Sequence, residues 1–256
     1  MFLADPEATI ERPARTERTA RLLLVDPCSA TRGAMLSLLE QAGFEALPAG
    51  DATAGLAILA TEAARLDALL IGVGMPGGEG LDALRRLRAP PAEGAGLPVL
   101  ALTGPGTASE REALLREGVE GCLAGPFRSD AIRAAVQGVL HAARAIGRAE
   151  EQPVWDEAIR AELDALPPEL RAEIGAAFAR ELPVLLQRLE AACLAADHAG
   201  ARAAAHALAG CAASFGASRL AALARVAERA AAREDAFAAC AAARRMRPLI
   251  LLAEAG

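Results

Sequence analysis

The feature that most constrains the fold is an alternation of short apolar runs with longer segments of helical spacing between Arg21 and Arg144. The apolar runs read RLLLV, FEAL, DALLI, PVLAL and GCLA, and a helix-like segment follows each of them. Strands that are apolar on both faces are expected where helices cover both sides of a parallel sheet. The pattern therefore predicts an α/β domain with a doubly wound, five-stranded parallel sheet.

The second half of the chain has no strand-like run after the charged stretch GRAEEQP at residues 147–153. Its amphipathic segments predict an antiparallel helical bundle with short loops around Gly200, Gly216 and Arg233. Pro183 is expected to kink or break the first long helix. We divide the chain into a disordered arm (1–19), the α/β domain (20–145), a linker (146–153) and a four-helix bundle (154–256) that is expected to fold alone.

Charge and cysteine content exclude several classes of protein. The net charge is −6, and the arginines form only short clusters without the basic stripe of a nucleic-acid-binding domain. The five cysteines are widely spaced and form no C-x-x-C motif, which favours reduced thiols over a disulfide framework or a zinc site.

The first residues carry acids and prolines where a signal peptide needs an apolar core, and no apolar run approaches the length of a membrane span. We expect a cytoplasmic protein.

One glycine-rich motif matches a dinucleotide-binding loop in its letters but not in its position. Residues 72–77 read GVGMPG, a literal match to the G-x-G-x-x-G of dinucleotide-binding loops. That loop normally follows the first strand of its unit, whereas this one follows the third predicted strand and contains Pro76. The strand-ending acid expected about 20 residues further on is replaced by the loop APPAEGAG. We do not assign nucleotide binding to this loop.

The ends of the predicted strands carry a more specific pattern. The four relevant stretches are LLLVDP, LLIGVGMPGGEG, VLALTG and CLAGPF. In their order and spacing they resemble the receiver domain of two-component response regulators, from about Arg21 to Arg144. The resemblance implies a flavodoxin-like strand order, and it rests on Asp26, on Met75, Pro76 and Gly77, on Thr103, and on Pro126 and Phe127.

The departures from this family fall on its chemistry. Gly72 stands where the resemblance places the phosphoacceptor Asp, Pro27 replaces the second acid of the metal-binding pair, and Gly125 replaces a Lys. Without the nucleophile no aspartyl phosphate forms at that position, and a single carboxylate is expected to bind Mg²⁺ weakly. We predict a pseudo-receiver in which Asp26 and Thr103 have structural roles. Asp67 is expected at the opposite end of the sheet.

Three histidines lie in or after the last α/β helix. His141 is interpreted as an ordinary helix residue, and His198 as a residue near the negative pole of a helix. His206 lies mid-helix among small neighbours, and Gly210 one turn later costs about 1 kcal/mol relative to Ala. The close approach of a partner would explain a glycine at this position.

The stretch AHALAGCAASFGASRLAAL around His206 resembles the histidine-containing phosphotransfer (HPt) domain, and the likeness extends from about Val154 to Ala253. It implies that His206 is the phosphoacceptor, with Arg202, Ala209 and Gly210 around it. Ala209 stands where the family usually has Lys, and Arg202 is a candidate to compensate. The resemblance implies no metal or cofactor in this chain, because the partner receiver supplies Mg²⁺.

These features predict a two-component phosphorelay intermediate that carries a phosphoryl group on His206 between receiver domains, without autonomous catalysis. Its expected partners are receiver domains of hybrid histidine kinases and response regulators, with no nucleic acid and no membrane. The pseudo-receiver would serve as a docking or dimerisation module. The alternative is a non-catalytic adaptor or inhibitor that binds these partners without phosphotransfer. A histidine kinase is disfavoured because no nucleotide-binding boxes follow His206, and a transcription factor because no basic recognition helix follows the α/β half.

Overall fold

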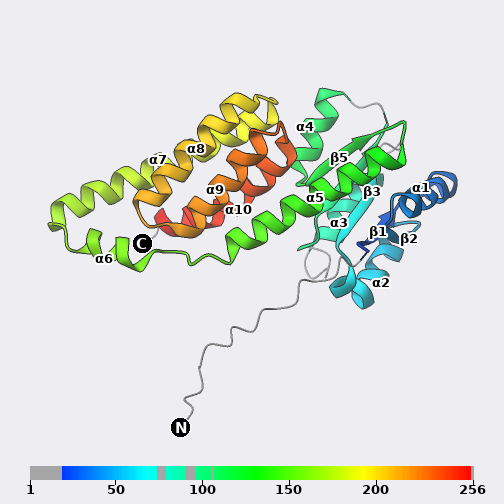
Figure 1. The fold of residues 1–256 in the computed structure, drawn as a ribbon, viewed down its shortest axis with the longest axis horizontal. Coiled ribbons are helices and arrows are strands. Elements are labelled where there is room, and N and C mark those ends of the chain that lie inside the picture. The colour runs from blue at the N-terminus through cyan, green and yellow to red at the C-terminus, as the bar shows by residue number, and fades with distance from the viewer. Residues whose placement is uncertain (1–18, 74–78, 90–95, 105–106, 255–256) are drawn as a thin grey trace, which may run out of the picture.

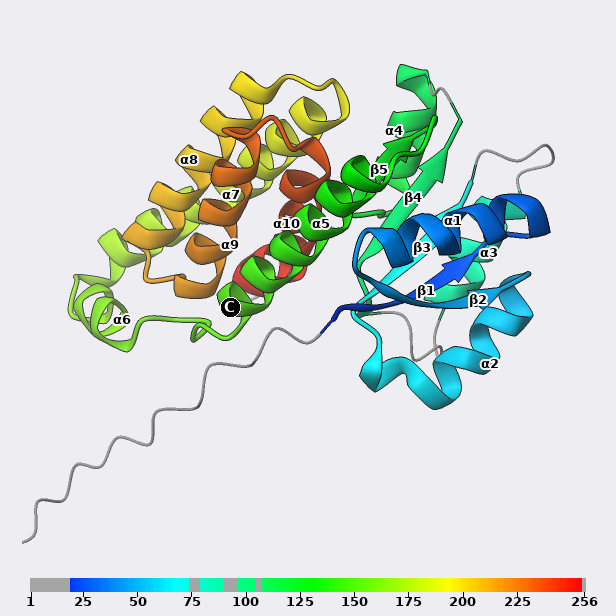
Figure 2. The same cartoon turned by 45° about the vertical axis from the view of Figure 1, so that its right-hand side comes forward.

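The computed structural model describes residues 19–73, 79–89, 96–104 and 107–254, which form an α/β domain and a helical bundle lying side by side (Figures 1 and 2). The predicted arm at 1–19 falls almost entirely outside the described residues, as do Met75, Pro76 and Gly77. Within the described part, every helix is too short or too polar to traverse a bilayer.

Five parallel strands form the sheet of the first domain, in the order β2-β1-β3-β4-β5. The strands are β1 (Arg21–Val25), β2 (Glu45–Ala49), β3 (Ala68–Gly72), β4 (Val99–Thr103) and β5 (Gly121–Ala124). This is the flavodoxin-like arrangement of doubly wound proteins. The predicted fold class is confirmed.

Helices cover both faces of the sheet because alternate residues of each strand enter different cores. Leu23 and Val25 of β1 pack with α2 (Ala52–Glu62), α3 (Glu79–Arg88) and α4 (Ala108–Arg116). Leu22 and Leu24 pack with α1 (Ser29–Gln41) and α5 (Ser129–Glu150). A short 3₁₀ helix, η1 (Ala63–Arg65), precedes β3. The double cover leaves the carboxyl ends of the strands free to form a site.

The bundle consists of α7 (Pro168–Leu194), α8 (His198–Ser214), α9 (Ser218–Ala231) and α10 (Ala236–Glu254), preceded by the short α6 (Glu157–Asp164). The sequence interpretation missed α6. It lies across the α8–α9 turn, where the Asp156 amide donates a hydrogen bond to the carbonyl of Gly216 at 2.6 Å. Gly216 has a φ of +69°, a conformation that glycine adopts at little cost.

Two expectations about the bundle helices need correction: the break that Pro183 was expected to cause, and the position of the loop near Gly200. Helix α7 runs through Pro183 without a break, because packing of its apolar stripe outweighs the hydrogen bond that proline cannot make. The loop expected around Gly200 lies earlier. Helix α7 ends at Leu194, Ala196 takes a φ of +57°, and the Asp197 side chain caps α8 by accepting from the Gly200 amide at 2.8 Å.

Helix α5 belongs to both domains. Its buried residues form one continuous stripe at helical spacing: Ile132, Val136, Val139, Ala142, Ile146 and Ala149. The first three pack on the sheet and the last three in the core of the bundle, against α9. The linker predicted at 146–153 therefore needs correction, because residues up to Glu150 are helical and packed.

A second contact joins α10 to the edge of the sheet. Arg244 donates hydrogen bonds to the carbonyls of Leu115 (3.2 Å) and Gly118 (3.0 Å), and its guanidinium lies 3.6 Å from Glu120. Phe237 packs against the cores of both domains. The bundle, which was expected to fold alone, therefore shares an apolar and ionic interface with the α/β domain.

Candidate functional site

His206 projects from the middle of α8 with 78% of its side chain exposed. Its Nδ1 lies 3.0 Å from Oε1 of Glu228, which extends from α9 and is itself 26% exposed. An ionised carboxylate only accepts hydrogen bonds, so Nδ1 carries the proton in this contact. When the ring carries this one proton, Nε2 keeps its lone pair and is the ring nitrogen able to act as a nucleophile.

Glu228 is the partner that the sequence interpretation missed. Helices α8 and α9 form an antiparallel hairpin that turns at Gly216 and Ala217. His206 and Glu228 lie eleven residues before and after Ala217, so they face each other across the hairpin. The symmetry of the predicted turn was the signal that would have paired them.

The three expected neighbours of His206 have different surroundings. Arg202 is exposed one turn before the histidine. Ala209 is 5% exposed and belongs to the bundle core, so it is not part of the exposed surface around the ring. A Cβ on Gly210 would meet no atom within 4 Å. Nothing within the described part of the chain requires a glycine there, which leaves an open surface beside His206.

The other two histidines do not share this arrangement. His141 lies exposed on α5. His198 is the first residue of α8, so it lies at the positive pole of a helix dipole. The expectation that it lies at the negative pole was wrong, since α8 begins two residues before Gly200.

The strand ends of the α/β domain bring together the residues expected there. Asp26 follows β1, is 4% exposed, and its Oδ1 accepts a hydrogen bond from the Cys28 amide at 2.8 Å. Burial raises the pKa of the Asp26 carboxyl, opposed by this hydrogen bond and by Arg32. A Cβ on Gly72 would lie 2.7 Å from Oδ2 of Asp26. The Asp26 carboxylate therefore occupies the space beside Gly72 that a side chain would need.

The remaining residues of this edge make local contacts. The Thr103 hydroxyl donates to the carbonyl of Gly104 at 2.9 Å, and the Gly125 amide donates to the carbonyl of Thr103 at 2.9 Å. Pro27 is exposed beside Asp26. Asp67 lies at the opposite end of the sheet, where it accepts from the Arg21 amide, as expected. These contacts are local, and the structural roles of Asp26 and Thr103 stay a prediction.

Comparison with known families accounts for both halves of the chain. The response regulator receiver domain family matches residues 22–137, and the Hpt domain family matches residues 173–254. The chain carries a receiver domain followed by an Hpt domain. Both predicted resemblances are confirmed, and the two domains place the chain in two-component phosphorelay signalling.

Individual relatives are similar to part of the chain. The response regulators MprA of Mycobacterium bovis and Mycobacterium ulcerans are 34% identical over 122 residues, which is 48% of this chain and 51% or 50% of theirs. The chain thus spans about half the length of these curated relatives. A receiver domain protein of Clostridium thermocellum and the chemotaxis protein CheY4 of Vibrio cholerae share 26% identity, with TM-scores of 0.42, over 48% of this chain and 94% and 99% of theirs.

The receiver domain offers a poor donor set for the Mg²⁺ that its family implies. Hard divalent cations prefer several carboxylate and carbonyl oxygens, whereas the carboxylate beside Gly72 is that of Asp26 alone, which already accepts a backbone hydrogen bond. Gly72, Pro27 and Gly125 add no side-chain ligand. Among the described residues, no three His, Cys, Asp or Glu side chains gather as a metal site would require. The residues present do not fit the metal.

Proposed function

We propose that His206 carries a phosphoryl group between the receiver domains of partner proteins, and that the chain's own receiver domain acts as a pseudo-receiver. The observation that supports this most directly is the exposed imidazole whose Nδ1 is held by Glu228 at 3.0 Å. Such a ring needs only a positioned electrophile, since phosphoryl transfer depends mainly on alignment and charge stabilisation.

In the proposed step, the Nε2 lone pair attacks the phosphorus of a partner's aspartyl phosphate. The new P–N bond forms as the acyl P–O bond breaks, and the partner's aspartate leaves as a carboxylate. The ring becomes a phosphoimidazolium that keeps its Nδ1 proton, and Glu228 stabilises its positive charge. Transfer onward to a second receiver reverses the same bond changes. The partner holds the Mg²⁺ on which this chemistry draws.

The surface around His206 supports this role. Gly210 leaves open space one turn after the ring, and Arg202 places an exposed positive charge one turn before it. A receiver that presents a phosphorylated aspartate approaches along α8 with little steric hindrance. Within this proposal the pseudo-receiver docks partners or pairs with a second copy, and the protein acts in the cytoplasm.

The experiment that tests the proposal is phosphotransfer from a ³²P-labelled receiver domain to the full-length chain. A phosphoramidate is acid-labile and alkali-stable, whereas an aspartyl phosphate is lost in alkali. We expect His206→Gln to abolish labelling completely, because it removes the nucleophile, and His141→Gln and His198→Gln to leave it intact. Labelling that persists in His206→Gln contradicts the site. Tight binding of receivers without any labelling favours the adaptor alternative.

A further inference from the structure

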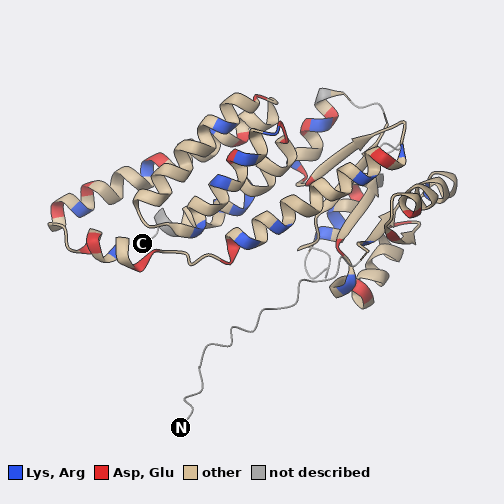
Figure 3. Ribbon diagram, viewed as in Figure 1, with Lys and Arg blue, Asp and Glu red and all other residues tan. Residues whose placement is uncertain are grey.

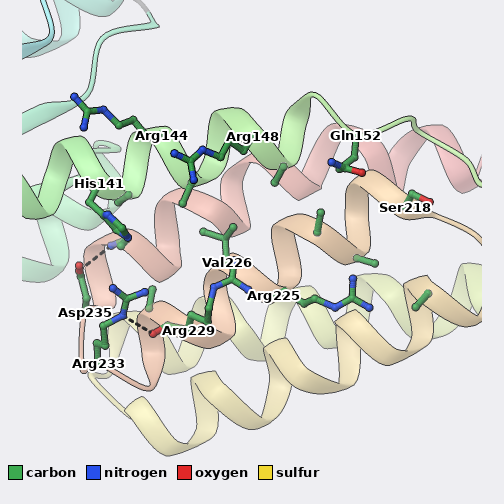
Figure 4. Close-up of a pocket in the computed structure, with 18 of the residues that line it drawn as sticks. His141, Arg144, Arg148, Gln152, Ser218, Arg225, Val226, Arg229, Arg233 and Asp235 are labelled. Carbon is green, nitrogen blue, oxygen red and sulfur yellow. Dashed lines mark hydrogen bonds between the residues drawn. The ribbon is translucent and has the colours of Figure 1, made fainter. Parts of the chain in front are cut away.

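A wide groove of about 1120 Å³ lies between α5 and α9, away from the strand ends of the receiver domain. Its walls carry an unusual number of positive side chains: Arg144 and Arg148 on α5, and Arg225, Arg229 and Arg233 on or just after α9 (Figure 4). Figure 3 shows basic residues recurring along these two helices. In a chain of net charge −6, this concentration of positive charge needs an explanation.

Among the described residues, the groove arginines lack the acid partners that several other exposed arginines have. Exposed arginines elsewhere, such as Arg85, Arg116 and Arg247, pair with acids at hydrogen-bond distance. Within the described part of the chain, no salt bridge engages the four wall arginines, Arg144, Arg148, Arg225 and Arg229. Their charges are exposed and uncompensated by neighbouring side chains.

Acidic side chains do not neutralise the groove. Asp156 and Asp235 line it, but both cap helices: Asp156 accepts from the Ala158 and Ile159 amides, and Asp235 accepts from the Ala238 amide. Five arginines against two engaged carboxylates leave a net positive field. Low-dielectric walls concentrate such a field within a cleft.

The spacing of the wall arginines limits the shape of the anion. Arg144 and Arg148 are four residues apart on one wall, and Arg225 and Arg229 are four apart on the other. Four residues of α-helix rise about 6 Å, so each wall carries two arginine positions about one turn apart. Guanidinium groups bind phosphate oxygens in pairs. The floor between them is apolar, with Ala145, Ala222 and Val226 among its residues.

We propose that this groove binds a small molecule with two or more phosphate groups, as in a nucleoside diphosphate or inorganic pyrophosphate. The opposed arginine pairs hold the phosphates, and the alanine floor accepts an apolar ring where the ligand has one. The groove lies between α9 and α5, the helix that the two domains share, and clefts between packed helices are common ligand sites. The site is separate from the phosphotransfer proposed for His206, and neither depends on the other.

Isothermal titration of the full-length chain with pyrophosphate, ADP and adenosine tests the proposal. We expect pyrophosphate and ADP to bind and adenosine to give no heat. Tighter binding of ADP than of pyrophosphate identifies a nucleotide, and equal affinity identifies a phosphate anion alone. Each lost hydrogen bond to a charged group is worth about 1.5–3 kcal/mol, so Arg148→Gln/Arg229→Gln should weaken binding at least about tenfold.

The control is Arg180→Gln/Arg188→Gln, which removes the same charge from exposed positions on α7. It should leave the affinity unchanged, and both double variants should melt as the parent protein does. Equal weakening in the control would reduce the effect to general electrostatics and overturn the proposal. No binding of pyrophosphate or ADP also overturns it. So does the finding that Arg148→Gln/Arg229→Gln instead abolishes docking of a partner receiver.

Discussion

At the scale of single residues, the contact between His206 and Glu228 decides which ring nitrogen faces solvent. Oε1 of Glu228 lies 3.0 Å from Nδ1 of His206 and keeps the proton on that nitrogen. A buried acid orients the histidine of a hydrolase triad in a similar way. Here the imidazole is 78% exposed and the carboxylate 26% exposed, so water competes for the same hydrogen bond. Glu228 is a positioning residue whose effect is smaller than that of a buried acid.

We expect Glu228→Gln to slow phosphotransfer to His206 about tenfold, because a neutral amide binds the phosphoimidazolium less strongly than a carboxylate does. Single-turnover labelling from a phosphorylated receiver measures the rate. Glu181→Gln, on the exposed surface of α7, removes the same charge and should leave the rate unchanged. A rate unaffected by Glu228→Gln would mean that the contact does not orient the ring during transfer.

The buried carboxyl of Asp26 predicts a pH-dependent stability. Burial raises its pKa in the folded state, so its contribution to stability is fully present below about 3.9, the ordinary pKa of Asp. That contribution is lost as the pH rises through the raised value. Asp26→Asn keeps an oxygen for the Cys28 amide and should stabilise the protein at pH 7, because it removes a charge that burial disfavours.

Urea unfolding at pH 4 and pH 7 measures this difference, and we expect a smaller gain at pH 4. Asp51→Asn is the control, because Asp51 is an exposed N-cap of α2 and Asn serves equally well there. Equal effects of Asp26→Asn at the two pH values would show that Asp26 titrates like a solvated acid.

The sequence indicates most residues of the candidate site, but it does not indicate the contacts that they make. The sequence predicts His206 and the glycine at position 72 directly, because each is a single substitution or match within a motif. It does not reveal that the Asp26 carboxylate occupies the space beside Gly72, since the position of a side chain follows from packing. It also places Ala209 beside the ring, whereas the turn of α8 takes that residue into the core.

At the scale of elements, type and order are predictable while helix ends are not. The strands and most helices follow from periodicity, which reports which face of an element is buried. The sequence analysis placed Gly147 in a linker and Gly200 in a loop, and expected Pro183 to kink or break its helix. The structure keeps all three inside helices, because tertiary packing outweighs local propensities of about 1–3 kcal/mol.

Pro183 offers a direct measure of that balance. It lies inside α7, where it removes a backbone hydrogen bond and crowds the preceding turn. We expect Pro183→Ala to raise the free energy of unfolding by about 1–3 kcal/mol, measured by urea denaturation. Pro168→Ala, at the first position of the same helix, should change it little, since proline fits that position. A destabilised Pro183→Ala would show that α7 depends on the shape proline imposes.

At the scale of the whole molecule, the interface between the domains is the main feature that the sequence did not predict. Arg244 bonds to carbonyls at the α4–β5 connection, 126 residues away for Gly118. No local pattern encodes such a contact. It appears only when the bundle is placed against the edge of the sheet (Figure 2).

We expect Arg244→Gln to lower the free energy of unfolding by about 2–4 kcal/mol, because it leaves Glu120 and two carbonyls with fewer donors at a partly buried interface. Calorimetry should then resolve two transitions in place of one. Arg247→Gln, which breaks an exposed pair with Glu190 within the bundle, should cost less than about 1 kcal/mol. Equal costs for the two variants would mean that the domains are not coupled through Arg244.

Helix α5 also limits how a chain of this kind is able to evolve. One stripe of side chains meets the sheet at Ile132, Val136 and Val139 and meets the bundle at Ala142, Ile146 and Ala149. Each residue inserted between the two sets would rotate the second by about 100° and turn it away from α9. Only insertions or deletions near whole helical turns preserve both contacts. The spacing of the two domains along α5 can therefore change only by about whole helical turns. An exchange of either domain for another receiver or Hpt domain must keep the same rotation of the two apolar sets about the helix axis.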